Sequence, residues 1–163
     1  MKKSNIIDDI SIKMMSTDFN YKPDYDDKTI LEIIKTVPDI NMKGRDGRTL
    51  LIHSAIYKRI EITRWLIEND AVIEERDIQG LSALHCAVMS NAPDIVEYLL
   101  KQGANINSRD NWGNTPLIRA NLNMDMIKLL LDHGADYTLA NNSGAKPEQI
   151  YEAYPNILSL FKK

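Results

Sequence analysis

Glycines recur along this chain at a nearly constant spacing. Gly47, Gly80 and Gly113 follow one another at equal intervals, and Gly144 comes after a slightly shorter one. The residues after each glycine also repeat, as in Gly-Leu-Ser-Ala-Leu-His-Cys-Ala from Gly80 and Gly-Asn-Thr-Pro-Leu-Ile-Arg-Ala from Gly113. A period of about 33 residues is typical of stacked repeats, in which each unit buries its apolar face against its neighbours. The spacing therefore predicts a solenoid of repeated units.

Each unit is predicted to contain two helices. A hydroxyl residue, Thr49, Ser82 or Thr115, stands where it can cap the start of the first helix. A second apolar stripe at helical period follows later in each unit, and Gly103 and Gly134 end two of these stripes. A glycine at this place commonly adopts the left-handed conformation that ends a helix. The pattern therefore indicates a helix pair in every unit.

The repeated motif resembles that of the ankyrin repeat family, Asp-x-x-Gly-x-Thr-Pro-Leu-His-x-Ala. The second unit matches it at Asp77, Gly80, Leu84, His85 and Ala87, and the third at Asp110, Gly113, Thr115, Pro116, Leu117 and Ala120. The first unit is weaker, because Gly44 replaces the aspartate, Ile52 the histidine and Asp70 the later glycine. The resemblance covers residues 28 to about 153. It implies an all-α ankyrin-repeat solenoid of paired antiparallel helices with short β-hairpin-like loops, with about three full repeats and incomplete capping units.

The period also gives the expected boundaries. We expect an N-terminal segment at 1–27 and an ankyrin repeat domain at 28–163, divided into a half repeat (28–43), repeats at 44–76 and 77–109, a shortened repeat (110–140) and a C-terminal cap (141–163). The N-terminal segment is either a short helix, packed on the first unit through Ile6, Ile7, Ile10 and Met14, or a frayed tail followed by an extended linker. The shortened repeat is trimmed between its helices, which predicts a shorter turn or a trimmed first helix there.

Composition excludes several classes of protein. The chain of 163 residues has one cysteine, so it has neither a disulfide framework nor a cysteine-built zinc site. Its net charge of −3 does not favour a general nucleic-acid binder. No apolar run approaches the roughly 20 residues of a membrane-spanning helix, and Asp8 and Asp9 interrupt any signal-peptide pattern. We expect a cytoplasmic protein that binds no membrane, nucleic acid, metal or cofactor.

His85 beside Cys86 is the most enzyme-like pair in the chain. Adjacent residues on a helix point about 100° apart, so the two side chains do not face each other. The resemblance implies that His85 is the structural histidine of the repeat. His53 and His133 lie in no recognisable metal motif. These observations favour a protein that is not an enzyme.

The resemblance implies a concave binding face made by the hairpin tips and the exposed side of the first helices. The candidate partner-binding residues at these places are Lys43, Arg45, Asp46, Arg48, Tyr57, Arg76, Ile78, Gln79, Met89, Arg109, Asn111, Trp112, Asn114 and Asn123. Exposed tryptophan and arginine are frequent hot spots of protein interfaces.

Three of these residues, Lys43, Arg76 and Arg109, follow one another at the repeat period and predict a row of basic side chains. Such a row favours a protein partner with an acidic surface. The alternative is that the cations pair with carboxylates of their own loops, such as Glu74, Glu75 and Asp77. Both interpretations stay open at this point.

The sequence thus favours a non-catalytic protein–protein interaction module that is a monomer when unbound. Two roles fit this class: a stand-alone inhibitor or immunity protein that occludes a toxin or enzyme, and a microbial or viral effector or adaptor that acts on host proteins. A self-associating structural repeat and an enzyme that uses His85 and Cys86 are the alternatives from other classes.

Overall fold

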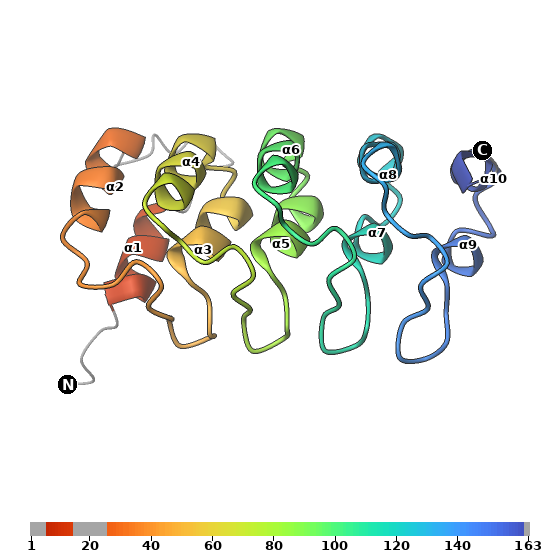
Figure 1. The fold of residues 1–163 in the computed structure, drawn as a ribbon, viewed down its shortest axis with the longest axis horizontal. Helices are drawn as coiled ribbons and strands as arrows, with labels where there is room; N and C mark the ends of the chain where they lie inside the picture. The colour runs from red at the N-terminus through yellow and green to blue at the C-terminus, as the bar shows by residue number, and fades with distance from the viewer. Residues whose placement is uncertain (1–5, 15–25, 162–163) are drawn as a thin grey trace.

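The protein is a row of helix pairs. The computed structural model describes residues 6–14 and 26–161. Within these residues it contains helices and no strand, in the order α1 (Ile6–Met14), α2 (Asp27–Ile34), α3 (Leu50–Ile56), α4 (Ile60–Glu68), α5 (Ala83–Met89), α6 (Pro93–Lys101), α7 (Pro116–Arg119), α8 (Met124–Asp132), α9 (Pro147–Ile150) and α10 (Pro155–Leu158), with a 3-10 turn at Ser159–Phe161. The all-α solenoid expected from the sequence is confirmed (Figure 1).

Two layers of helices and one row of loops build the stack. In Figure 1 the even-numbered helices form an outer row, the odd-numbered helices an inner row, and the hairpin loops project from the inner row. The inner helices pack on outer partners and on neighbouring inner helices; α5, for example, packs on α3, α6 and α7. Because these contacts run between neighbours, the hydrophobic core is a continuous layer between the two rows.

The helix ends follow the chemistry of the residues there. The hydroxyl oxygens of Thr49, Ser82 and Thr115 accept the backbone N–H groups of the residues three positions on, at 3.4 to 3.5 Å. After the outer helices, Gly103 and Gly134 have φ of 88° and 85°, and Asp70 takes the same place with φ 66°. The hydroxyl caps thus fix where three inner helices begin, and the left-handed residues fix where three outer helices end.

The first helix pair is more complete than the half repeat expected at 28–43. Helix α1 lies in the inner row beside α3 and contacts both α2 and α3 (Figure 1). Ile7 and Ile10 are fully buried, while Ile6 is exposed. The expected stripe thus buries Ile7 and Ile10 but not Ile6, and the side chain of Met14 and the proposed extended linker lie outside the described residues.

The shortened third repeat has a trimmed first helix. Helix α7 has four residues, whereas α3 and α5 have seven each. Tyr151, which follows α9, is buried and donates its hydroxyl hydrogen to the carbonyl oxygen of Leu117 at 3.0 Å. The next repeat therefore satisfies a carbonyl group of this short helix.

Candidate partner-binding surface

The hairpin tips are held together by backbone hydrogen bonds. We number the hairpins 1 to 4 by their tips: Arg45-Asp46, Ile78-Gln79, Asn111-Trp112 and Asn142-Ser143. The N–H of Ile78 donates to Asp46 O at 3.0 Å, that of Asn111 to Gln79 O at 3.0 Å, and that of Asn142 to Trp112 O at 2.9 Å. Inside hairpin 3, Asp110 Oδ1 accepts the N–H groups of Trp112 and Asn114. The tips therefore form a preordered surface.

A concavity of about 740 Å³ lies between hairpins 2 to 4 and the inner helices. Its lining residues are Gln79, Leu81, Met89, Trp112, Asn114, Arg119, Asn141, Asn142 and Ser143. Four of the fourteen candidate residues, Gln79, Met89, Trp112 and Asn114, are thus brought together there. The candidate residues omit Arg119, although it stands one repeat period after Cys86, on the same side of the first helix. That repeat position gave no signal of a surface role, because Cys86 is buried.

Trp112 and Arg119 both line this concavity and contact each other. The guanidinium carbon of Arg119 lies 5.3 Å from the centroid of the Trp112 ring, and the Trp112 side chain remains 51% exposed. Arg119 donates from Nε to Asp110 Oδ2 at 2.7 Å, and its Nη2 bonds the same oxygen. Burial pushes the pKa of the Asp110 carboxyl upward, but the hydrogen bonds from Arg119 and Asn114 outweigh this and hold the pKa below its usual value. The indole is therefore presented on a fixed, charge-balanced support.

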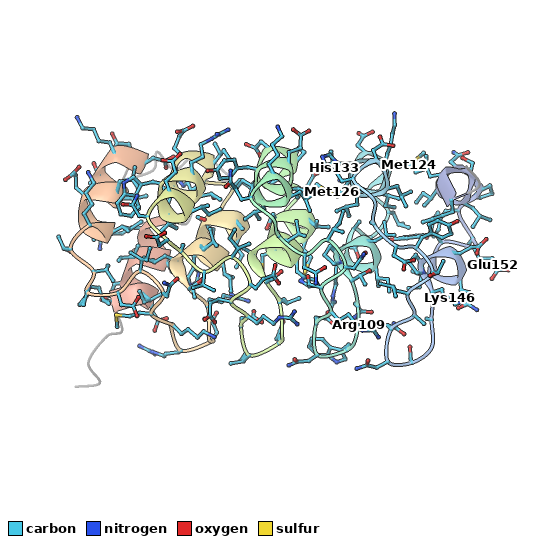
Figure 2. All side chains as sticks on the ribbon, viewed as in Figure 1. Arg109, Met124, Met126, His133, Lys146 and Glu152 are labelled. Carbon is cyan, nitrogen blue, oxygen red and sulfur yellow. The ribbon has the colours of Figure 1, made fainter. Side chains whose placement is uncertain are left out.

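The basic row lies along the hairpins, and each of its members binds a carbonyl group of the next repeat. Lys43 donates to Arg76 O at 3.1 Å, Arg76 to Arg109 O at 2.5 Å, and Arg109 to Ala140 O at 2.7 Å. Lys43 also pairs with Glu75 at 2.6 Å. Arg76 and Arg109 form no ion pair within the described part of the chain. Figure 2 shows Arg109 at the level of the hairpin loops, far from His133 on the outer row.

The other two basic candidates, Arg45 and Arg48, also form ion pairs, but the partner of Arg45 lies in α1 and not in its own loop. Arg45 lies 3.0 Å from a carboxylate oxygen of Asp8 in α1. Arg48 lies 2.9 Å from Asp46 and 3.3 Å from the buried carboxylate of Asp77. These residues, including Asp46, stabilise hairpin 1 and its junction with hairpin 2.

The remaining candidates lie outside the concavity. Tyr57 stacks on His53 with ring centroids 6.1 Å apart, and Asn123 accepts the N–H of Met126 at the start of α8. Asn111 Nδ2 donates to Ile78 O at 2.9 Å, and the Ile78 side chain is exposed. Tyr57, Asn123 and Asn111 thus make contacts within the fold, whereas the Ile78 side chain is exposed to solvent.

His85 and Cys86 are buried and their environment is that of core residues. His85 is fully buried; Ser82 N donates to its Nδ1 at 3.3 Å, and its Nε2 lies 3.2 Å from Asn114 O in the next repeat. Burial lowers the pKa of His85 and raises that of the Cys86 thiol to about 12. Cys86 therefore stays a thiol at neutral pH, and thiols are poor nucleophiles. Among the described residues no group of three or more His, Cys, Asp or Glu side chains is placed to hold a metal ion.

Comparison with known families agrees with this architecture. A model described as ankyrin repeats (3 copies) matches residues 22–110, and a single ankyrin repeat model matches residues 112–142. The chain belongs to the ankyrin repeat family. Ankyrin repeats generally mediate protein–protein interaction, and the family is typically non-catalytic. No helix in the described ranges is long and apolar enough to span a membrane.

Several curated proteins are similar to this chain. A putative ankyrin repeat protein of fowlpox virus is 32% identical over 83% of this chain and 40% of its own length. A probable 26S proteasome regulatory subunit, p28 of Saccharomyces cerevisiae, is 34% identical over 74% of this chain and 57% of its own length. Protein phosphatase 1 regulatory subunit 27 of Mus musculus is 38% identical over 51% of this chain and 56% of its own length. The chain thus spans less than two thirds of each of these relatives.

Proposed function

We propose that this protein is a non-catalytic module that binds a partner protein through the concavity between hairpins 2 and 4. The observation that carries the proposal is the half-exposed Trp112 ring, held in that concavity by Arg119 and Asp110. Tryptophan and arginine dominate binding energy at interfaces, most strongly in well-packed pockets. Because the tips are already ordered by their hydrogen bonds, binding costs little conformational entropy.

The charge of the hairpin row favours an acidic partner surface. The guanidinium groups of Arg76 and Arg109 bind neutral carbonyl oxygens, so their positive charges are positioned but not cancelled. Charges at the rim of an interface act mainly on the association rate and are screened by salt. We therefore assign Trp112 to affinity and the two arginines to attraction of the partner.

The names of two relatives support a binding role. The yeast and mouse proteins are each named as a regulatory subunit, of the 26S proteasome and of protein phosphatase 1 respectively. A regulatory subunit acts by binding another protein. The proposed function is of the same kind: this chain would bind a partner protein of its own.

The test measures affinity for a partner that the intact chain captures from the source cell and that is then purified. Trp112→Ala should weaken the equilibrium affinity by roughly 30-fold, which corresponds to about 2 kcal/mol. Lys101→Ala, an exposed change on α6 in the outer row, is the matched control and should leave affinity unchanged. Equal affinity of the Trp112→Ala and Lys101→Ala variants would reject the concavity as the binding site.

A second arm tests the charge assignment. The Arg76→Gln and Arg109→Gln double variant keeps a hydrogen-bond donor at each position but loses the charge. It should slow association and flatten its dependence on ionic strength, with a smaller effect on dissociation. A partner whose association rate is the same for the double variant and the parent chain does not recognise the row by charge.

A further inference from the structure

The charge of the concavity between hairpins 2 and 4 is balanced from inside. Among the residues that line it, Arg119 is the charged one, and its Nε and Nη2 both bond Asp110 Oδ2. The Asp110 side chain is fully buried. Against the effect of this burial, the hydrogen bonds from Arg119 and Asn114 lower the pKa of the Asp110 carboxyl, so it is ionised at neutral pH. The positive charge of Arg119 is therefore already neutralised.

A carboxylate of the partner is a poor match for this place. It would be the second anion on a guanidinium group that already binds Asp110, and like charges brought together at an interface repel each other. Burying an anion without its own countercharge is also costly. Arg76 and Arg109, whose charges are not cancelled, suit carboxylates better. We therefore expect acidic groups at the hairpin row and an uncharged group in the concavity.

The basic row meets the concavity at hairpin 4. A Cβ atom on Gly113 would lie 2.7 Å from Nη2 of Arg109 and 2.8 Å from the backbone nitrogen of Asn142. Arg109 is thus a neighbour of Asn142, which lines the concavity. One short segment of a partner can therefore place a carboxylate near Arg109 and an adjoining uncharged residue in the concavity.

The concavity has hydrogen-bond donors that the fold does not use. Nη1 of Arg119 and the indole N–H of Trp112 bond no acceptor among the residues that the structure describes. In contrast, the Asn141 carboxamide donates to Asn114 Oδ1 and accepts the N–H of Ala145, so it is taken up by the fold. The unused donors are matched by a neutral acceptor, such as the main-chain carbonyl oxygen of a peptide.

The apolar groups of the concavity favour an aromatic side chain as its occupant. Trp112 and Met89 line it and are 51% and 47% exposed. Contacts of an aromatic ring with an indole and with a thioether are both favourable. The volume of about 740 Å³ is in the range of sites that hold a whole small ligand, so it accommodates a ring together with its main chain.

We propose that the concavity receives an uncharged aromatic residue of the partner, with its ring against Trp112 and Met89 and a main-chain carbonyl oxygen hydrogen-bonded to Arg119 or to the Trp112 indole. The acidic groups of the partner lie beside this residue, at Arg109 and Arg76. The inference rests on the proposed function and adds the chemistry of the segment that the concavity binds.

The probe is N-acetylphenylalaninamide, which has an aromatic ring, peptide-like carbonyl groups and no charge. It is titrated into the ¹⁵N-labelled full chain at about 0.15 M salt, which screens the exposed arginines. The indole N–H signal of Trp112 should shift saturably, with a dissociation constant on the order of 1 mM, as a ligand of this size allows. The chain's second tryptophan, Trp65, lies on α4 in the outer row, and its indole signal should not move.

Two related compounds separate charge from shape. N-acetylphenylalanine has a carboxylate in place of the carboxamide and should bind roughly fivefold more weakly, because it brings a second anion to Arg119. N-acetylalaninamide keeps the carbonyl groups but lacks the ring, and it should cause no saturable shift.

Exposed methionines provide matched variants of the protein. Met89→Gln replaces the thioether by a polar group at an exposed position, so the fold is kept, and it should weaken binding of the amide probe by roughly fivefold. Met124 is 41% exposed but does not line the concavity, so Met124→Gln should leave the Trp112 shifts unchanged.

Three results would each overturn the inference: no saturable shift of the Trp112 signal, equal affinity for the amide and carboxylate probes, or equal affinity of Met89→Gln and Met124→Gln for the amide probe. The proposed function fails separately, since it depends on whether Trp112→Ala weakens the affinity for the purified partner. Loss of partner affinity in Trp112→Ala without any shift by the probe would keep the binding site and reject an uncharged aromatic residue as its occupant.

Discussion

At the scale of single residues, Gly44 shows how the first repeat departs from the family motif. In the second repeat Asp77 Oδ1 accepts the N–H groups of Gln79 and Leu81 and so fixes its own hairpin. Gly44 has no carboxylate for this purpose. Asp8 of α1 takes part of the role by accepting the N–H of Arg45, and its Oδ1 would lie 2.5 Å from a Cβ atom on Gly44.

Restoring the motif by Gly44→Asp should therefore destabilise the protein. The new side chain would displace Asp8, add a second carboxylate beside it and break the contacts with Arg45, at a cost of about 1–2 kcal/mol in the free energy of unfolding. Urea denaturation measures the change. The double variant Asp8→Ala and Gly44→Asp should recover most of the loss, because the new aspartate can then bind its own hairpin. A stabilising effect of the single change would contradict this account.

His85 should make the stability of the fold depend on pH. Its pKa is lowered by burial, so protonation is easier in the unfolded state, whose histidine titrates at 6.5. The folded state is therefore favoured above that pH, and its stability falls as the pH drops below about 6.5 towards the lowered value. His53 has a lowered pKa for the same reason and contributes in the same direction.

Urea midpoints measured from about pH 8 to about pH 5 test this effect. His85→Gln should reduce the fall in stability with acid without removing it, since His53 remains. A profile that is identical in the parent chain and in His85→Gln would show that His85 is not the source.

Sequence patterns predicted residues whose role lies within one repeat better than residues that bind the next one. The caps at Thr49, Ser82 and Thr115 follow from local spacing. In contrast, Arg76 and Arg109 bind backbone carbonyl groups of the following repeat, and every residue has such a group. A bond to a backbone carbonyl group leaves no pattern in the side chains. The sequence analysis therefore considered only carboxylates as partners of these arginines.

At the scale of elements, the shortest inner helix depends on its neighbour. Helix α7 has only four residues, so most of its carbonyl groups lack partners within the helix. The Tyr151 hydroxyl lies 3.0 Å from Leu117 O and 3.4 Å from Ile118 O and is buried between α7 and α9. The deletion in the third repeat was visible in the sequence, but this compensation by a tyrosine of the next repeat was not.

Tyr151→Phe should therefore destabilise the protein although it leaves the packed volume almost unchanged. It removes the donor from buried carbonyl oxygens, which costs about 1–3 kcal/mol. The same change at the exposed Tyr154 is the control and should be close to neutral. Thermal or urea unfolding of both variants makes the comparison, and equal stabilities of the two would exclude a role for the Tyr151 hydroxyl.

The position of helix α1 in the stack was not predicted from the sequence. The Ile7 and Ile10 spacing suggested a helix packed on the first unit, but nothing in the repeat pattern placed it as the inner partner of α2. The inner helices α3, α5 and α7 begin after a glycine hairpin and a hydroxyl cap. The residues before α1 contain no glycine, so the period could not align this helix with the rest.

At the scale of the whole molecule, the stack behaves as a one-dimensional array. The centre, α3 to α6, has neighbours on both sides, whereas α9 and α10, of four residues each, have a neighbouring repeat on one side only among the residues that the structure describes. At this end the Phe161 ring stacks on the Tyr151 ring, with centroids 6.0 Å apart. The centroid of the Phe161 ring also lies 5.7 Å from that of Tyr137. In such arrays stability is the sum of unit and interface terms, so unfolding starts at the weaker end.

Hydrogen exchange should resolve this gradient. Phe161→Ala should speed amide exchange in α9 and α10 through local opening, while exchange in α3 to α6 changes little, because the lost contacts belong to the end of the stack. Leu99→Ala, a fully buried change in α6, should instead lower the stability of the whole array by about 2–5 kcal/mol and speed exchange in every helix pair that unfolds with the centre. Uniform acceleration along the chain in Phe161→Ala would mean that the stack unfolds as a single cooperative unit, with interfaces between repeats strong enough to couple the last hairpin to the first.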